Sequence, residues 1–263
     1  MIRYLMVLLL MLMPFNVYAL TAEEVMKKSQ AAFFYPGNDF KARVMMKLIS
    51  KGGQERIRGL TMLRKNYGEV GGNQKYFIYF FQPADVKDMT FMVWKYPGKD
   101  DDRWLYIPSI KMVRRIAAKD EQSSFVGSDF TYEDVSGREL AVDTYTLVRE
   151  EQLNGRNCYV VKSVPKEAKS AGYGEKLSWI DVENFLPLKE EYTDKRGKLD
   201  RVFTTDEVKV INGIPTAIKR TMKNLQNGHR TEVTFESVAY NLGLPDDLFT
   251  ERSLQSVPMQ WIK

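Results

Sequence analysis

Apolar and polar residues alternate through most of the chain, a pattern that predicts β-strands with one buried face. Between Phe40 and Ser50 the side chains at every second position are apolar, and residues 54–64 follow as a returning strand. Residues 75–82 are instead apolar on both faces of the predicted strand. Further strands are expected over residues 89–96, 102–107, 111–116, 144–153, 156–165, 176–181, 187–193, 199–211, 214–225 and 229–240.

Short glycine-containing turns separate many of these strands. The turns are Gly52-Gly53, Asn154-Gly155, Asn212-Gly213 and Asn227-Gly228. Asn-Gly is a strong hairpin signal because a type I′ turn needs positive φ at both central residues. Hairpins join antiparallel strands, and a large sheet tends to curl. We therefore expect a mainly β (α+β) fold, in which a strongly curved antiparallel sheet of roughly eleven to thirteen strands forms an incomplete barrel.

Helices are expected at both ends of the domain. Thr21 and Glu24 have the spacing of a capping box, and the helix that follows should end before Pro36. A second short helix should begin near Pro245, and a third is possible within residues 123–135. We expect these helices to fill the concave side of the sheet.

The stretch from Asp100 to Asp134 stands out from the regular strands. After two short strands it ends in residues 123–134, which have neither helical nor strand periodicity but carry Phe125 and Phe130. An irregular polar segment with embedded aromatic residues predicts a lid, which is a loop that covers an apolar surface and can move away from it.

The first residues have the organisation of a secretory signal peptide. Arg3 precedes an apolar run from Tyr4 to Met13, and Val17-Tyr18-Ala19 resembles a cleavage site. The run is too short to span a bilayer. We expect cleavage after Ala19, a single domain over residues 20–263 and a periplasmic location.

Composition limits the classes of function that the chain can have. Its 263 residues are 44% hydrophobic and 28% charged, with a net charge of +5 and one cysteine, Cys158. Basic and acidic residues are interspersed, so nucleic acid is not an expected partner. Cys158 lies in a predicted strand and is expected to be a buried structural thiol.

Residues that could perform catalysis or bind a metal are few. The single histidine, His229, follows an Asn-Gly pair and is expected to be an exposed turn residue. The Asp100-Asp101-Asp102 run is expected to be a solvated loop and not a cation site. Asp129, Glu133 and Asp134 could form the acid/base pair of a hydrolase, but nothing else in the sequence supports that chemistry. We expect no enzymatic activity, no metal and no cofactor.

Methionine and aromatic residues are abundant in the N-terminal half, more than one sheet face can bury. Either a dry core or a ligand cavity could take this surplus, and methionine suits a surface that accepts variable chains. The candidate cavity and lid residues are Met46, Met62, Phe77, Tyr79, Phe91, Trp94, Trp104, Tyr106, Met112, Phe125 and Phe130. Arg114 and Arg115 are candidates for the rim, where they would meet an anionic headgroup, and Arg58 and Arg64 are the alternative pair.

Three motifs in the central stretch resemble a known family. Trp104 to Pro108 reads W-x-Y-x-P, Val113 to Arg115 is a basic strand, and Ser124 to Asp134 reads S-F-x-G-S-D-F-T-Y-E-D. Together they are similar to the outer-membrane lipoprotein-sorting family, the LolA/LolB-like periplasmic carriers, in a branch associated with RND-type (MMPL-like) exporters. Elsewhere the resemblance is limited to the order of the strands.

This resemblance implies a half-barrel closed by helices. It also implies a monomeric carrier that binds lipid or lipoprotein acyl chains in a hydrophobic cavity and ferries them toward the outer membrane. An RND/MMPL-type inner-membrane permease is an implied possible partner. The alternative is an accessory subunit of such an exporter that docks on the permease and carries no lipid.

Overall fold

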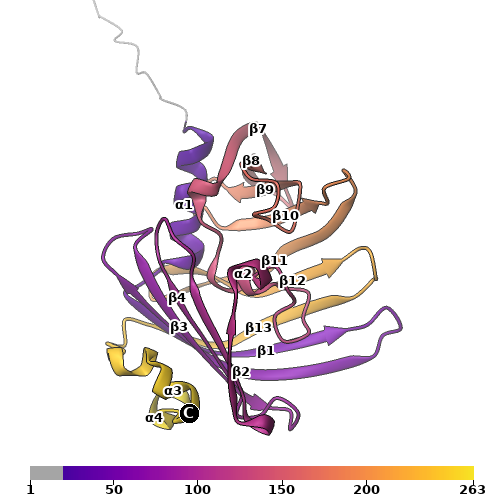
Figure 1. The fold of residues 1–263 in the computed structure, drawn as a ribbon. Helices are drawn as coiled ribbons and strands as arrows, with labels where there is room; N and C mark the ends of the chain where they lie inside the picture. The colour runs from indigo at the N-terminus through magenta and orange to yellow at the C-terminus, as the bar shows by residue number, and fades with distance from the viewer. Residues whose placement is uncertain (1–19) are drawn as a thin grey trace, which may run out of the picture.

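One antiparallel sheet of 13 strands makes up most of the computed structural model, which describes residues 20–263 (Figure 1). The predicted signal peptide lies outside the described residues. The strands are β1 (Asp39–Ile49), β2 (Glu55–Tyr67), β3 (Asn73–Gln82), β4 (Thr90–Lys95), β5 (Asp102–Ile107), β6 (Met112–Ile116), β7 (Asp143–Leu153), β8 (Arg156–Pro165), β9 (Glu175–Asp181), β10 (Pro187–Thr193), β11 (Leu199–Ile211), β12 (Ile214–Asn224) and β13 (Arg230–Tyr240). The helices are α1 (Ala22–Phe34), α2 (Tyr132–Ser136), α3 (Glu251–Gln255) and α4 (Met259–Ile262), with 3-10 turns η1 (Pro108–Ile110), η2 (Ala118–Asp120), η3 (Leu140–Val142) and η4 (Asp246–Phe249).

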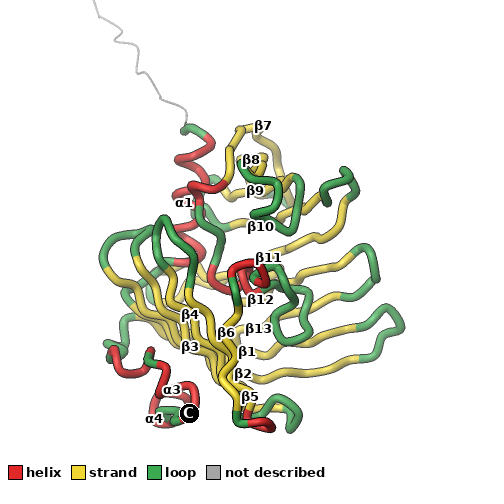
Figure 2. Tube along the Cα trace, in the orientation of Figure 1, coloured by secondary structure: helices red, strands yellow, loops and turns green. Residues whose placement is uncertain are grey.

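The strand order is β6-β5-β4-β3-β2-β1-β13-β12-β11-β10-β9-β8-β7. Every pair is therefore consecutive in the chain except β1 and β13, which join two meanders into one sheet. Within the described residues, β6 and β7 are the two edges and do not pair with each other, so the sheet is not closed. Figure 2 shows the sheet curving around α2. This architecture confirms the predicted mainly β, incomplete barrel.

The turns confirm two of the three Asn-Gly predictions. Asn154 and Gly155 have φ of 51° and 81°, and Asn212 and Gly213 have φ of 50° and 79°, as a type I′ turn requires. At the third pair only Gly228 has positive φ. The connection there is longer, and the Asn227 side chain accepts a hydrogen bond from the backbone N–H of His229 (2.8 Å).

The concave face of the sheet carries the main core. Phe40, Ala42, Val44, Met46 and Leu48 all point to this face from β1 and are buried, as their alternation predicts. From β3, Tyr76, Ile78 and Phe80 join them. The alternate residues of β3 point to the convex face, so the strand is apolar on both sides because both sides are covered.

The C-terminal segment covers the convex face beneath β3, β4 and β5 (Figure 1). Leu248, Phe249 and Leu254 are buried in a second core with Phe77 and Trp104 of the sheet. Hydrogen bonds fix the segment in place: Thr61 donates to the carbonyl of Ile262 (3.0 Å), Thr90 to that of Leu254 (2.7 Å) and Trp94 to that of Phe249 (3.0 Å). The expectation that the C-terminal helix fills the concave side was wrong, because the outer face of these strands is itself apolar and has to be covered.

Helix α1 covers part of the concave side, as predicted. Thr21 and Glu24 form both hydrogen bonds of the capping box, so the predicted helix start is confirmed. At the other end Arg64 of β2 donates to the carbonyls of Phe34 and Pro36, and Gln74 of β3 also donates to that of Phe34 (2.8 Å). A cation at a helix C-terminus is favourable, and these contacts attach the end of α1 firmly to the sheet.

Replacing Leu254 by Ala should lower the free energy of unfolding by about 2–5 kcal/mol, because its side chain is fully buried in the second core. Urea unfolding measures the change. The control is Leu242→Ala, at a leucine that is 40% exposed, which should change stability by less than about 0.5 kcal/mol. Equal effects of the two substitutions would show that the C-terminal segment does not form a core with the sheet.

Candidate ligand-binding cavity

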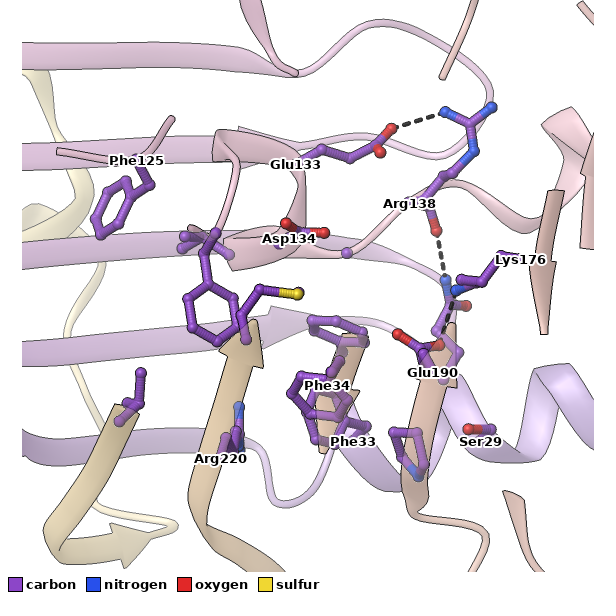
Figure 3. A pocket seen from close by; sticks show the side chains of 18 of the residues that line it. Ser29, Phe33, Phe34, Phe125, Glu133, Asp134, Arg138, Lys176, Glu190 and Arg220 are labelled. Atoms are coloured by element: carbon purple, nitrogen blue, oxygen red, sulfur yellow. Dashed lines mark hydrogen bonds and ion pairs between the residues drawn. The ribbon is translucent and has the colours of Figure 1, made fainter. Parts of the chain in front are cut away.

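A cavity of about 180 Å³ lies on the concave side of the sheet, between β-strands, α1 and the segment that contains α2 (Figure 3). One part of its wall is apolar. The sheet contributes Val44, Met46, Leu60, Met62, Ile78, Met222, Val233 and Phe235, and the covering elements contribute Met26, Phe33, Phe34, Phe125, Phe130 and Val135. A concave site with a mostly apolar wall and a few polar groups is the usual form of a small-molecule site.

The other part of the wall carries charged residues in ion pairs. Arg138 pairs with Glu133 (2.8 Å) and Asp143 (3.0 Å), and Lys176 pairs with Glu190 (2.8 Å), as Figure 3 shows for Glu133 and Glu190. Burial alone would lower the pKa of Arg138, but the hydrogen bonds with Asp143 and the charge of Glu133 raise it above its ordinary value. These pairs keep the charges compensated inside the fold.

Residues 117–137, which we call the lid segment, close the cavity on one side. Phe125 is only 2% exposed and packs against Phe91 and Tyr132, with ring centroids 5.3 Å and 5.7 Å away. Short hydrogen bonds hold the loop together, including one from the backbone N–H of Phe125 to the carbonyl of Phe130 (2.7 Å). Among the described residues, the backbone–backbone hydrogen bonds of the lid segment are all internal to it.

Side chains, rather than a strand ladder, attach the lid segment to the sheet. The Asp129 carboxylate contacts His229 Nδ1 (2.6 Å) and accepts a hydrogen bond from Thr231 (2.7 Å). Asp134 pairs with Arg201 (2.9 Å). Because no backbone ladder crosses this boundary in residues 20–263, the lid segment can leave the sheet without breaking strand pairing.

The structure brings four of the predicted ligand residues to the cavity wall: Met46, Met62, Phe125 and Phe130. Phe91 is fully buried beneath Phe125 in the concave core and does not line the cavity. Phe91→Asp would therefore place a carboxylate in a dry core and disrupt the fold.

Five other predicted residues lie away from the cavity, and their assignment is corrected. They are Phe77, Tyr79, Trp94, Trp104 and Tyr106, all on the convex face in contact with the second core. Their strands have apolar residues on both faces, and alternation alone does not tell which face is concave.

The predicted rim residues also lie elsewhere. Met112 is 52% exposed on the edge strand β6, which carries Arg114 and Arg115 as well. Arg115 pairs with Asp102. None of these three lines the cavity.

Several cavity residues had no recognisable signal in the sequence. Arg138, Lys176, Glu190 and Arg220 come from separate parts of the chain and meet only in the folded sheet. Phe33 and Phe34 end the predicted first helix, and their position at its C-terminus was the one available hint.

The candidate catalytic residues are all engaged in pairs. Asp129 contacts His229, Glu133 pairs with Arg138, and Asp134 pairs with Arg201. His229 is thus an attachment point of the lid segment, and the expectation of a merely exposed turn residue is corrected. Cys158 is buried, as predicted.

Two residues of the acidic run are paired rather than solvated: Asp101 contacts Arg103 (2.8 Å) and Lys95 (3.8 Å), and Asp102 pairs with Arg115, whereas Asp100 is exposed as expected. Residues 20–263 contain no group of histidine, cysteine, aspartate and glutamate side chains arranged to hold a metal ion. Within the same residues no helix is long and apolar enough to cross a membrane.

Comparison with known structures places this fold in the class of lipoprotein-sorting-like proteins. The chain is similar to a DUF1329 family protein from Desulfovibrio piger, with 28% identity, a TM-score of 0.81 and coverage of 88% of this chain and 96% of that one. It is similar also to a candidate outer membrane lipoprotein-sorting protein domain from Vibrio parahaemolyticus, with 27% identity, a TM-score of 0.82 and coverage of 89% and 98%. A LolA superfamily protein from Nitrosomonas europaea shares the fold at 20% identity, with a TM-score of 0.69 and coverage of 89% and 99%.

The family itself follows from a family model that matches residues 72–256, most of the chain. The chain belongs to this family, whose model is described as "Uncharacterized protein". A comparison with curated proteins finds no match. The similar structures are described as lipoprotein-sorting or LolA superfamily proteins rather than as enzymes.

Replacing Asp129 by Ala should loosen the lid segment, because it removes the acceptor shared by His229 and Thr231. Hydrogen–deuterium exchange should become faster in residues 117–131, and the free energy of unfolding should fall by about 1–3 kcal/mol. Exchange in the C-terminal segment should not change. Unaltered exchange in the lid segment would contradict the attachment described here.

Proposed function

We propose that this protein is a periplasmic carrier that binds the acyl chain of a lipid or lipoprotein in the concave cavity and moves it toward the outer membrane. The observation that carries the proposal is the apolar hollow beneath a lid segment that no backbone ladder ties to the sheet in the described residues. Transfer of an acyl chain requires an apolar pocket and a cover that opens, and it requires no covalent chemistry.

The free energy of transferring an acyl chain from water into the cavity determines how the chain can be released. Each methylene group that leaves water for an apolar site contributes about 0.8 kcal/mol. A whole acyl chain therefore gains on the order of 10 kcal/mol, so its spontaneous release into water is rare. Delivery then needs a membrane or a partner protein that accepts the chain while the cover is open.

The size of the cavity supports the interpretation that the structure is the closed form of such a carrier. Its volume is about 180 Å³, and an apolar cavity of about 150 Å³ is known to hold one benzene molecule. The closed cavity can thus take only a short alkyl segment. A full chain can enter only if one covering element moves outward.

The lid segment is the covering element that can move. Helix α1 is held by hydrogen bonds from Arg64 and Gln74 to the carbonyls at its C-terminal end. The lid segment is attached to the sheet by contacts that each involve a side chain, among them the pairs Asp129–His229 and Asp134–Arg201 and the hydrogen bond from Arg58 to the carbonyl of Val126 (3.1 Å). Side-chain contacts of this kind break and reform more easily than a strand ladder.

The periplasmic location in this proposal rests on two features. Residues 1–19 have the sequence of a signal peptide. The Vibrio parahaemolyticus structure, at 27% identity, is described by a role in outer membrane lipoprotein sorting. A monomeric state is part of the same proposal.

A second candidate function is an accessory subunit that docks on an RND-type inner-membrane permease and carries no lipid. The exposed edge strand β6 favours it, because Met112 and Arg114 lie on an edge with no further strand beside it in the described residues. Stable co-purification with a permease, together with failure to bind acyl chains, would select this function over the carrier.

Met62→Trp should block the cavity, because Met62 lies in the cavity wall and the larger indole ring would occupy part of the space. A fluorescent fatty acid titrated into the protein should bind roughly tenfold or more weakly to this variant than to the wild type. Met259→Trp is the matched control, because Met259 is 37% exposed in the C-terminal segment. Equal affinities in the wild type and Met62→Trp would argue against this cavity as the site.

A reversible disulfide between the lid segment and the sheet should show that the lid segment has to open for ligand uptake. The Thr231 hydroxyl contacts both the carboxylate (2.7 Å) and the backbone N–H (3.0 Å) of Asp129, so these two positions are the candidates for an engineered disulfide. Burial raises the pKa of the native Cys158 thiol to about 11, so it should not compete. Ligand uptake by the oxidised double variant should be slow and should recover after reduction. Uptake at the same rate in both redox states would rule out this opening.

A further inference from the structure

Arg220 is a guanidinium on the cavity wall that lies between two aromatic rings. Its central carbon is 4.2 Å from the ring centroid of Phe33 on α1 and 4.4 Å from that of Phe235 on β13. Figure 3 shows it beside Phe33 and Phe34 in the cavity. The aromatic rings cover the faces of the guanidinium plane, and such cation–π contacts are favourable for arginine.

The edge of the same guanidinium faces no protein acceptor. Nε donates to the carbonyl of Ala217 (3.0 Å), and among the described residues Nη1 and Nη2 make no hydrogen bond to protein. Two parallel N–H groups on a held, planar edge match the two oxygens of a carboxylate or phosphate.

Among the described residues, every carboxylate around the cavity pairs with a residue other than Arg220, so the positive charge of Arg220 has no counter-charge. The carboxylates of Glu133 and Asp143 pair with Arg138, and that of Glu190 pairs with Lys176. Asp134, the remaining acidic residue of the wall, pairs with Arg201. In residues 20–263, Arg220 is the one cation of the cavity wall that forms no ion pair.

A purely structural role does not account for this arrangement. Arg64, the other arginine buried nearby, gives its hydrogen bonds to carbonyls at the end of α1. Arg220 has no such acceptor for its Nη groups, and burial lowers its pKa to about 10, with the Arg64 charge acting in the same direction. Burying a charge with no counter-charge is costly, and an apolar side chain of similar length would avoid that cost.

We propose that the cavity binds an anionic amphiphile, with its carboxylate or phosphate head on the edge of Arg220 and its alkyl tail against Met46, Met62 and Leu60. This assignment rests on the proposed carrier function and specifies the ligand class. The anionic head supplies the missing counter-charge, and the apolar wall takes the tail.

Three ligands with the same eight-carbon tail test the assignment: nonanoate, octyl phosphate and 1-octanol, titrated calorimetrically into the full mature protein at pH 7.5. The wild type should bind at least one anion roughly tenfold or more tightly than octanol, the effect expected of charge-assisted hydrogen bonds. The tighter of the two anions identifies the head as a carboxylate or a phosphate.

Arg220→Met should abolish the preference for the anion and leave octanol binding unchanged. Its melting temperature should not fall, whereas loss of a structural arginine would lower it. The matched control is Lys223→Met, which removes one positive charge from an exposed position on the same strand and should keep the preference.

Three results would overturn the assignment. If octanol binds as tightly as both anions, or if Arg220→Met keeps the preference, the anion site is absent while the carrier function stands. If none of the three ligands binds, and a long-chain fluorescent fatty acid does not bind either, the proposed function fails together with this inference.

Discussion

A sheet that is apolar on both faces has to be covered on both faces, and this constraint determines the rest of the structure. On the convex side the C-terminal segment seals the outer residues of β3 to β5 in a dry core. On the concave side α1 and the lid segment cover the sheet. Their cover is incomplete, and the cavity is the space that remains between them and the sheet.

The two covers differ in how many of their apolar side chains are buried, and that difference connects the fold to its function. Leu248, Phe249 and Leu254 pack into the convex core, and the hydrogen bonds from Thr61 and Thr90 hold the C-terminal segment from below. The lid segment inserts Phe125 into the concave core, and its polar contacts with the sheet include those of Asp129 and Asp134 and the hydrogen bond that the Val126 carbonyl accepts from Arg58. A closed cavity of about 180 Å³ under a side-chain-held lid suits a carrier that must open to load its cargo.

Much of the fold could be predicted from the sequence because its signals are local. The alternation in β1 gave the buried residues Phe40 to Leu48, Thr21 and Glu24 marked the start of α1, and Asn154-Gly155 marked a hairpin. Where apolar and polar residues do not alternate, the sequence does not tell which residues face the concave side of the sheet. Phe77 and Ile78 are both buried, yet only Ile78 lines the cavity.

The cavity was predictable only in part, because its polar wall is assembled from residues far apart in the chain. Met46, Met62, Phe125 and Phe130 follow from apolar composition and from the aromatic residues of the lid segment. Arg220 appears in the sequence as one of many strand arginines, and its role depends on Phe33 of α1, which only the folded chain brings beside it.

Mass spectrometry of lipids extracted from the natively purified protein tests the central claim most directly. The account predicts that the protein isolated from its own periplasm contains an amphiphile with an acyl chain, in an amount comparable to that of the protein. Protein that is isolated free of lipid, and that remains so after incubation with membranes, would contradict it.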